Sequence, residues 1–438
     1  MLKVAKFGGS SLSNPTQWKK IKNIVSKDDS IKIVVVSALG KDDVRVSKIT
    51  DLLLLLRTHI ELGIDYESLF QEITKRFLEI KQSLQLTLDI DQDLRNFKKE
   101  LSNNLSKDYL VSRGEYFTAK LMSEYLGFVF VDSLDCIFVN YSGSVEYDKT
   151  NKTLQSIFKA KEKIVVPGFY ANAPLNKVRL FSRGGSDLTG SIISNALEVN
   201  LYENWTDVDG LFVADPKIIN NVDPIKQITY RELRELAYRG ANVIHEETII
   251  PLENKNIPIQ IKNTNKPDIS GTIISSNFEH NGSYVTGIAG KKDYTSFNIV
   301  KKSNFSKIKV LRDVLNIFYR YNVNVENIPS GIDSFSVIVE SSQIKACSFD
   351  LFDDIHNILE VHDVQIEECI SLIAVVGKNM ASIPGVAGKL FASLGDKGIN
   401  IKIIAQGSAE LSIIVGVHND DYGAAINTIY DEFYLKNK

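Results

Sequence analysis

From Met1 to about Lys262, short apolar runs alternate with stretches of helical periodicity, and this alternation constrains the fold more than any other feature of the chain. The apolar runs predict strands at residues 2–7, 31–37, 128–132, 163–166, 178–181, 201–205 and 258–261. Helical patterns lie between them, for example at residues 15–25, with Asn14 as the predicted N-cap, and at 47–62. Alternating strands and helices are typical of an α/β fold, in which helices cover a mostly parallel sheet.

The pattern changes near residues 284–293, and two similar units follow that each predict the order βαββαβ. The first has a helix at 307–321 and strands at 323–328 and 334–340, and the second has strands at 371–377, 399–405 and 411–417 around a helix at 385–397. Units this small are expected to pair, which leaves grooves for small ligands. We therefore expect three domains, at residues 1–285, 294–370 and 371–438. Residues 66–105 predict a helical insertion, whose role the sequence leaves open.

Charge and cysteine content exclude several classes of protein. The net charge of -3 gives no long-range attraction to nucleic acid or an acidic membrane surface. Cys136, Cys347 and Cys369 lie far apart and have no metal-ligand spacing, which indicates thiols in a reducing compartment. The N-terminus has no basic segment followed by a long apolar one, and the leucine run at 52–56 is too short to cross a bilayer. We expect a soluble cytoplasmic protein without a metal site.

Two glycine pairs follow predicted strands. Lys6 precedes Gly8 and Gly9, and such a turn lets backbone N–H groups approach phosphate oxygens while the lysine adds a positive charge. The segment Ser182 to Asp187 repeats the arrangement with Arg183, which could hold a carboxylate or phosphate bidentately. Each pair could also be an ordinary turn, and Ser186 or Asp187 a helix cap.

Two further polar segments stand beside predicted strands or helices. Ser112 to Glu115 is expected at the start of a helix that runs to about Leu126, where it could be a capping box. Trp205 to Gly210, followed by Asp215 to Lys217, places Thr and Asp after a strand, either as a simple turn or where a nucleotide could bind.

Together, these four segments resemble the aspartate kinase family in order, spacing and composition. Lys6 to Gly9 resembles its KFGG motif, Ser182 to Asp187 its GRGGSD segment, Ser112 to Glu115 its substrate-binding helix start, and Trp205 to Pro216 its TDVDG…DP nucleotide loop. The C-terminal duplication resembles the paired ACT domains of that family. The resemblance implies an amino-acid kinase fold and phosphorylation of the aspartate side chain by ATP, giving 4-phospho-L-aspartate for lysine, threonine and methionine biosynthesis, with feedback inhibition through the ACT domains.

The resemblance also implies roles for individual residues. The matching positions are Lys6 and Asp187 for catalysis; Ser37, Thr50, Glu115 and Arg183 for aspartate; Lys6, Gly8, Gly9, Ser10, Thr206, Asp207, Phe212 and Lys217 for ATP; and Asn324, Val325, Glu326 and Ser330 for the effector. Mg²⁺ is expected to be held mainly by ATP. Because the attacking carboxylate is ionised at neutral pH, no strong base such as His245 is needed.

The effector and the assembly are expected from the same resemblance. Glu326 could neutralise the second ammonium of lysine, so lysine is favoured over threonine, and a homodimer or larger homo-oligomer is expected through the ACT domains. Asn242 stands where many relatives have a lysine that contacts the nucleotide. Kinases of the same fold that act on glutamate, N-acetylglutamate, carbamate or UMP remain alternatives, although they typically lack the ACT pair. A non-catalytic sensing protein is the other alternative.

Overall fold

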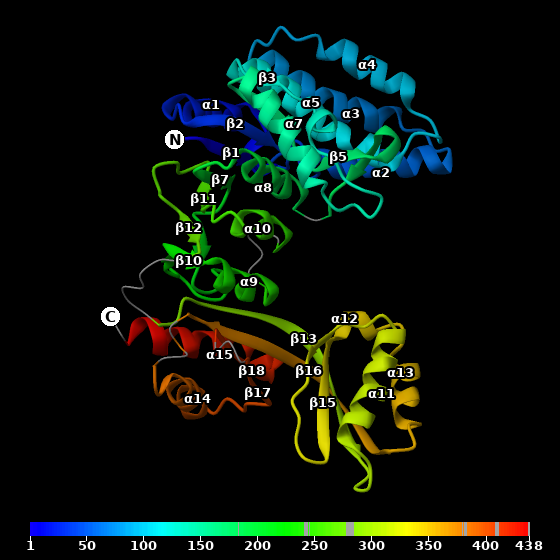
Figure 1. The fold of residues 1–438 in the computed structure, drawn as a ribbon, viewed down its shortest axis with the longest axis vertical. Coiled ribbons are helices and arrows are strands. Elements are labelled where there is room, and N and C mark those ends of the chain that lie inside the picture. Colours follow the sequence, from blue (N-terminus) through cyan, green and yellow to red (C-terminus); the bar gives the residue numbers. More distant parts are fainter. Residues whose placement is uncertain are drawn as a thin grey trace. The chain divides into compact units, whose positions relative to one another are not determined.

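The structure is a computed structural model (Figure 1), which describes residues 1–182, 184–240, 244, 246–276, 284–378, 380, 383–407 and 411–436. The chain forms two compact units. The first consists of Met1–Leu211, Pro224–Tyr230 and Val243–Phe278, and the second of Phe212–Asp223, Arg231–Asn242 and Glu279–Lys438. None of the helices in the described parts of the chain is long and apolar enough to span a membrane.

The first unit is built on an eight-stranded sheet. Its strands lie in the order β10 (Gln227–Thr229), β12 (Thr272–Ser275), β11 (Ile259–Asn263), β7 (Leu201–Thr206), β1 (Lys3–Phe7), β2 (Ile31–Val36), β4 (Ile164–Pro167) and β3 (Val129–Phe130). All neighbours pair in parallel except β11 and β12. The predicted α/β fold with a mostly parallel sheet is therefore confirmed.

Helices cover this sheet and form the insertion. They are α1 (Pro15–Lys27), α2 (Ile49–Leu62), α3 (Glu67–Ser83), α4 (Ile90–Glu100), α5 (Lys107–Leu126), α6 (Ser133–Cys136), α7 (Tyr147–Ala160), α8 (Gly185–Leu197) and α10 (Glu246–Glu253). Asn14 caps α1 as predicted, because its Oδ1 accepts a hydrogen bond from the N–H of Gln17 at 3.1 Å. The insertion at residues 66–105 is helical, as expected, and consists of α3 and α4.

Two predictions about the first unit were wrong in detail. The strand expected at 178–181 is β6 (Lys177–Leu180), which pairs with β5 (Tyr170–Ala173) in a separate two-stranded sheet. Ser112 does not start a helix, because α5 begins five residues earlier at Lys107, where Ser106 is the N-cap. The Ser112 hydroxyl instead donates to the Tyr109 carbonyl within the helix, at 2.7 Å.

The second unit contains a six-stranded antiparallel sheet. Its strands lie in the order β14 (Val325–Asn327), β15 (Ser334–Glu340), β13 (Gly287–Lys301), β16 (Val361–Val376), β18 (Ser412–His418) and β17 (Ile403–Gln406). Its helices are α11 (Lys307–Arg320), α12 (Ser341–Ile344), α13 (Ser348–His356), α14 (Val386–Asp396) and α15 (Tyr422–Tyr430), and α9 (Tyr230–Tyr238) lies almost entirely in this unit. The expected pair of βαββαβ units is present.

The two βαββαβ units share their central strands β13 and β16, which run side by side in Figure 1. The first half of β13, Gly287 to Lys291, pairs with the end of β16 and completes the sheet of the second βαββαβ unit. The second half of β13, from Tyr294, pairs with β15 and is the first strand of the first βαββαβ unit. Register shifts between Lys291 and Tyr294 separate the halves. Residues 287–291, which the sequence left between domains, are therefore part of the sheet.

Candidate active site

The predicted site residues gather at one edge of the first unit's sheet. The parallel register aligns Phe7 with both Val36 and Trp205, so the carboxyl ends of β1, β2 and β7 lie together. Backbone hydrogen bonds continue past these ends, from Ser37 N–H to the Phe7 carbonyl at 3.2 Å and from Gly8 N–H to the Trp205 carbonyl at 3.0 Å. Open α/β sheets bind ligands at this edge.

Lys6 and Asp187 form an ion pair at this edge. Successive side chains of a strand face opposite sides, so Ala5 and Phe7 pack in the core with Val36 and Trp205 while Lys6 faces the other side. There its ammonium lies 2.5 Å from Oδ1 of Asp187, and both side chains are largely buried. Burying an ion pair contributes little to stability, so this pair is a stronger sign of function than of folding.

Asn204 completes the cluster, and the sequence did not predict it. It lies beside Lys6 in the β1–β7 register, donates to Asp187 Oδ1 at 3.0 Å and accepts from the Lys6 ammonium at 3.4 Å. The signal in the sequence that could have identified Asn204 is its polar side chain within a strand predicted to be buried. The three side chains fix the position of the ammonium.

Glycines bring Asp187 into place. Asp187 lies in the first turn of α8, whose N-cap Gly184 has φ +73, a conformation that favours glycine. A side chain on Gly185 would begin 2.6 Å from the ring of Phe169, so only glycine lets α8 start this close to the turn after β4. Phe169 itself has φ +79, a strained conformation for an aromatic residue. Arg183, predicted to bind aspartate, lies outside the described residues.

The predicted phosphate turn lies next to the Lys6 ammonium. A side chain on Gly8 would begin 3.5 Å from both the Lys6 amine and the Trp205 carbonyl oxygen, so the Lys6 charge lies directly beside the turn. Ser10 begins the short 3-10 helix Ser10–Leu12 that follows the two glycines. The turn can therefore present backbone and a cation to a phosphate.

Glu115 is a buried carboxylate that lacks a full set of partners. It lies inside α5 with 4% of its surface exposed, and its Oε2 has no hydrogen-bond partner in the described structure. Burial raises its pKa to about 8, although hydrogen bonds from the backbone of Ala38 and of Glu115 itself oppose the shift. Ser37 and Thr50, the other predicted aspartate contacts, are partly exposed on either side of the loop that contains Ala38. An unmatched buried carboxylate is suited to an ammonium ligand.

The predicted nucleotide residues are divided between the two units. Thr206 ends β7 and its hydroxyl donates to exposed Asp207 at 3.2 Å, while Asn263 holds the Asp207 carbonyl at 3.3 Å. Phe212, in β8 (Leu211–Phe212), and exposed Lys217 belong to the second unit. The first unit therefore assembles Thr206 and Asp207, but not Phe212 or Lys217, with Lys6.

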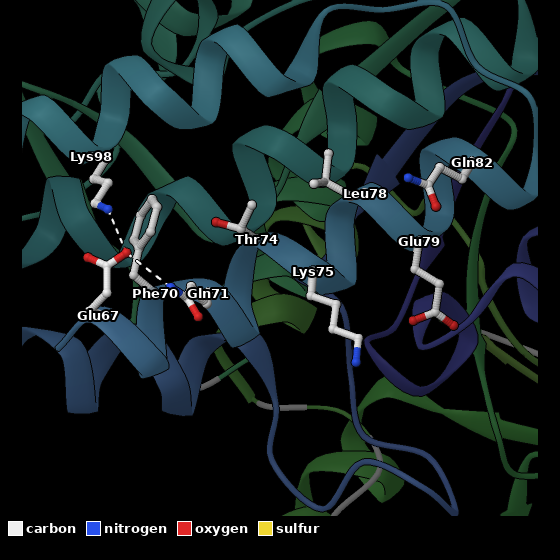
Figure 2. Close-up of a pocket in the computed structure, with 9 residues that line it drawn as sticks. All are labelled: Glu67, Phe70, Gln71, Thr74, Lys75, Leu78, Glu79, Gln82 and Lys98. Carbon is white, nitrogen blue, oxygen red and sulfur yellow. Dashed lines mark hydrogen bonds and ion pairs between the residues drawn. The ribbon is translucent and has the colours of Figure 1, made fainter.

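An open hollow of about 520 Å³ lies elsewhere, along α3 (Figure 2). Its lining residues are Glu67, Phe70, Gln71, Thr74, Lys75, Leu78, Glu79, Gln82 and Lys98. Glu67 and Lys98 form an ion pair across one end at 2.7 Å. This hollow contains none of the predicted site residues.

The predicted effector residues lie around β14 in the second unit. Glu326 is not a solvent-facing glutamate, because its side chain is 10% exposed and pairs with Arg239, after α9, at 3.1 Å. Burial, the negative charge of Glu326 and a hydrogen bond to it raise the pKa of Tyr238, the last residue of α9. Asn324 donates its N–H to the side chain of Gln343 at 2.8 Å. Val325 pairs with β15, and Ser330 lies 3.5 Å from the Lys307 ammonium.

Comparison with known proteins identifies the family of the chain. Residues 1–263 match the amino acid kinase family, and residues 373–433 match an ACT domain. Aspartokinase 3 of Bacillus subtilis is 34% identical, over 99% of each chain. The bifunctional aspartokinase/homoserine dehydrogenase 2 of Arabidopsis thaliana is 28% identical over 99% of this chain, which spans 51% of that longer protein.

Solved structures show the same similarity. The aspartate kinase of Clostridium acetobutylicum, described as an allosteric enzyme, superimposes with a TM-score of 0.91 and 40% identity, covering 99% of each chain. Aspartokinase III of E. coli, solved with aspartate and ADP, shares the fold with a TM-score of 0.79 at 22% identity. The chain therefore belongs to the amino acid kinase family and, within it, to the aspartate kinases.

Proposed function

We propose that this protein transfers the γ-phosphate of ATP to the side-chain carboxylate of L-aspartate, giving 4-phospho-L-aspartate. The observation that carries the proposal is the Lys6 ammonium, which Asp187 and Asn204 hold beside Gly8 of the glycine turn. A preorganised cation next to a glycine turn is what a transferring phosphoryl group requires. The complex of the E. coli relative with aspartate and ADP supports the same pair of ligands.

In this mechanism, an oxygen of the aspartate side chain attacks the γ-phosphorus in line with the bond that releases ADP. The carboxylate is already ionised, so the protein contributes position and charge rather than a base. Lys6 stabilises the negative charge of the transferring group, and Asp187 keeps the lysine in place. Gly8, Gly9 and Ser10 line the phosphates, which Lys217 also faces, and Thr206, Asp207 and Phe212 bind the nucleotide beside them.

The aspartate would be held at both ends. Glu115 receives its α-ammonium, Arg183 a carboxylate, and Ser37 and Thr50 complete the pocket. Mg²⁺ would be held mainly by the phosphates of ATP. No group of three His, Cys, Asp or Glu side chains that could hold a metal ion occurs in the part of the chain that the structure describes.

Release of ADP in the presence of alternative acceptors tests the assignment. With aspartate, glutamate, N-acetylglutamate and UMP supplied in parallel, we expect turnover with aspartate only. Faster turnover with another acceptor would assign the chain to a different activity of the same fold. If the protein binds an amino acid but releases no ADP with any of the acceptors, a sensing protein would be favoured.

The regulatory region is assigned by the same reasoning. We propose an amino-acid effector site at Asn324, Val325, Glu326 and Ser330, with lysine favoured over threonine. The ACT units would associate in a homodimer or larger homo-oligomer, in a cytoplasmic enzyme with domains at residues 1–285, 294–370 and 371–438. Because Arg239 already neutralises Glu326, a lysine ammonium would have to compete with this guanidinium.

This competition makes a testable prediction. Glu326→Gln keeps the shape of the side chain but removes its charge, so inhibition by lysine is expected to require at least about tenfold more lysine. Inhibition titrations with lysine, threonine and both together measure this shift. Glu360 is the matched control, because it is a similarly buried acid of the same unit that pairs with Lys309 instead. Unchanged sensitivity in Glu326→Gln, or an equal loss in Glu360→Gln, would contradict the site.

A further inference from the structure

Arg76, on α3 of the helical insertion, is a buried arginine whose described partners are backbone carbonyls. It is 5% exposed, and its guanidinium donates to the carbonyls of Ser47, at 2.8 Å, and Gly40. Burial lowers its pKa from the usual value. None of the described residues forms an ion pair with it, and its Nε has no hydrogen-bond partner among them. A cation buried in this way is costly, so a role beyond stability is indicated.

Gly40 and Ser47 lie on the two sides of the loop that joins β2 to α2, here called its two arms. Its base is closed by a hydrogen bond from Ile49 N–H to the Leu39 carbonyl, at 3.0 Å. The loop has no regular secondary structure between these residues, so its position depends on such contacts. Arg76 holds both arms at once, which fixes the width and position of the loop.

The same loop packs directly against the predicted phosphate turn. Gly40 donates its N–H to the carbonyl of Gly9 at 2.9 Å. A side chain on Gly40 would begin 2.7 Å from the Ser10 nitrogen and closer still to the Gly9 carbonyl group. With two backbones this close, a displacement of Gly40 must also displace Gly9.

A second arginine joins the tip of the loop to the same helix. Arg45 forms ion pairs with Glu79 of α3 at 2.5 Å and with Asp42 at 2.9 Å. Figure 2 shows Glu79 on α3. It also donates to the carbonyl of Ser13 at 3.2 Å, just beyond the glycine turn. The insertion thus contacts the loop at its base and at its tip.

We infer that Arg76 is a positioning residue for phosphoryl transfer: it holds Gly40 and Ser47 so that the loop fixes Gly9 and the turn beside Lys6. The inference rests on the function proposed above, and it gives the helical insertion a role. Ala38 and Thr50 flank the loop, so the aspartate pocket would be held by the same contacts.

Arg76→Lys is the main test, because a lysine retains the charge but cannot hold two carbonyls as a planar fork. We expect kcat to fall by about 10- to 100-fold, the effect of a small misplacement of reacting groups, with a smaller change in KM for ATP. Arg57→Lys is the matched control. Arg57 also donates to a carbonyl of the insertion, that of Leu105 at 2.6 Å, but none of its contacts is with Gly9 or Gly40 in the described structure. Its kcat should change by less than about twofold.

Amide hydrogen exchange measures the same link without using activity. The Gly40 amide should lose protection in Arg76→Lys and keep it in Arg57→Lys, at equal Tm. A normal kcat despite lost protection, or a lowered kcat with protection intact, would overturn the inference. If wild type lacks aspartate kinase activity, the proposed function fails, and lost kcat with the true acceptor then decides the role of Arg76.

Two glycine-to-alanine variants keep the inference testable if the Arg76 variants do not fold. Gly40→Ala should lower kcat at least as much as Arg76→Lys, because its methyl group meets the Gly9 backbone. Gly388→Ala is the control, since nothing lies within 4 Å of its added carbon. Equal kcat values for the two folded variants would contradict the inference.

Discussion

Lys6→Ala is expected to lower kcat by about 10²- to 10³-fold, the usual effect of removing one preorganised charge-stabilising group. The structure places the Lys6 ammonium 2.5 Å from Asp187 and beside Gly8. The loss should be in kcat, because the charge matters most while the phosphoryl group is being transferred. Steady-state kinetics with aspartate and ATP both varied separate this effect from weaker binding.

Lys3→Ala is the matched control for this variant. Lys3 lies on the same strand and forms ion pairs with Asp28 at 2.7 Å and Glu203 at 3.0 Å, so its removal also leaves acids unpaired. It should lower Tm while leaving kcat nearly unchanged. Near-normal turnover in folded Lys6→Ala, or a similar loss of kcat in Lys3→Ala, would remove Lys6 from its catalytic role.

The KM for aspartate is expected to fall about tenfold for each pH unit between pH 6 and 8, and then to level off. Burial raises the pKa of Glu115 to about 8 in the free protein, so the carboxylate is mostly protonated at pH 6. Only its charged form can pair with the α-ammonium of aspartate. Glu115→Gln should raise KM at pH 8 by about 10²-fold and remove the pH dependence.

Protein stability should decrease as pH rises, while the affinity for aspartate increases. Between the unfolded pKa of 4.5 and the folded pKa of about 8, the folded protein keeps a proton on Glu115 that the unfolded chain has lost. The free energy of unfolding therefore falls as pH rises through this range, and Glu115→Gln should lessen the fall. Thermal unfolding at pH 6 and 8 without substrate measures this change in stability.

For the KM prediction, a Glu115→Gln variant with wild-type KM at both pH values would show that the α-ammonium of aspartate binds elsewhere.

Much of the fold could be predicted because it depends on local patterns. The apolar runs around Lys6 and Trp205 have strand periodicity, and Asn14 followed by Pro15 marks a helix start. The start of α5 was misplaced because Ser112 and Glu115 have capping-box spacing, although Ser106 is the N-cap that the chain uses. The sharing of β13 and β16 could not be predicted, since strand pairing depends on contacts between distant segments.

The candidate site likewise divides into residues that the sequence could identify and contacts that only the folded structure shows. The motif residues Lys6, Asp187 and Glu115 could be named from their resemblance to a family, but their partners could not. Asn204 is 198 positions from Lys6, and Arg239 is 87 positions from Glu326. Only the folded chain brings such residues together, and it also shows which buried carboxylate remains unmatched.

Trapping the product with hydroxylamine tests the central claim most directly. An acyl phosphate formed on aspartate reacts with hydroxylamine to give a hydroxamate, and mass spectrometry with synthetic standards distinguishes the side-chain isomer from the α isomer. We predict the side-chain hydroxamate of aspartate, formed in step with ADP and strongly reduced in Lys6→Ala. The α isomer, or ADP release without any hydroxamate of aspartate, would contradict phosphorylation of the aspartate side chain.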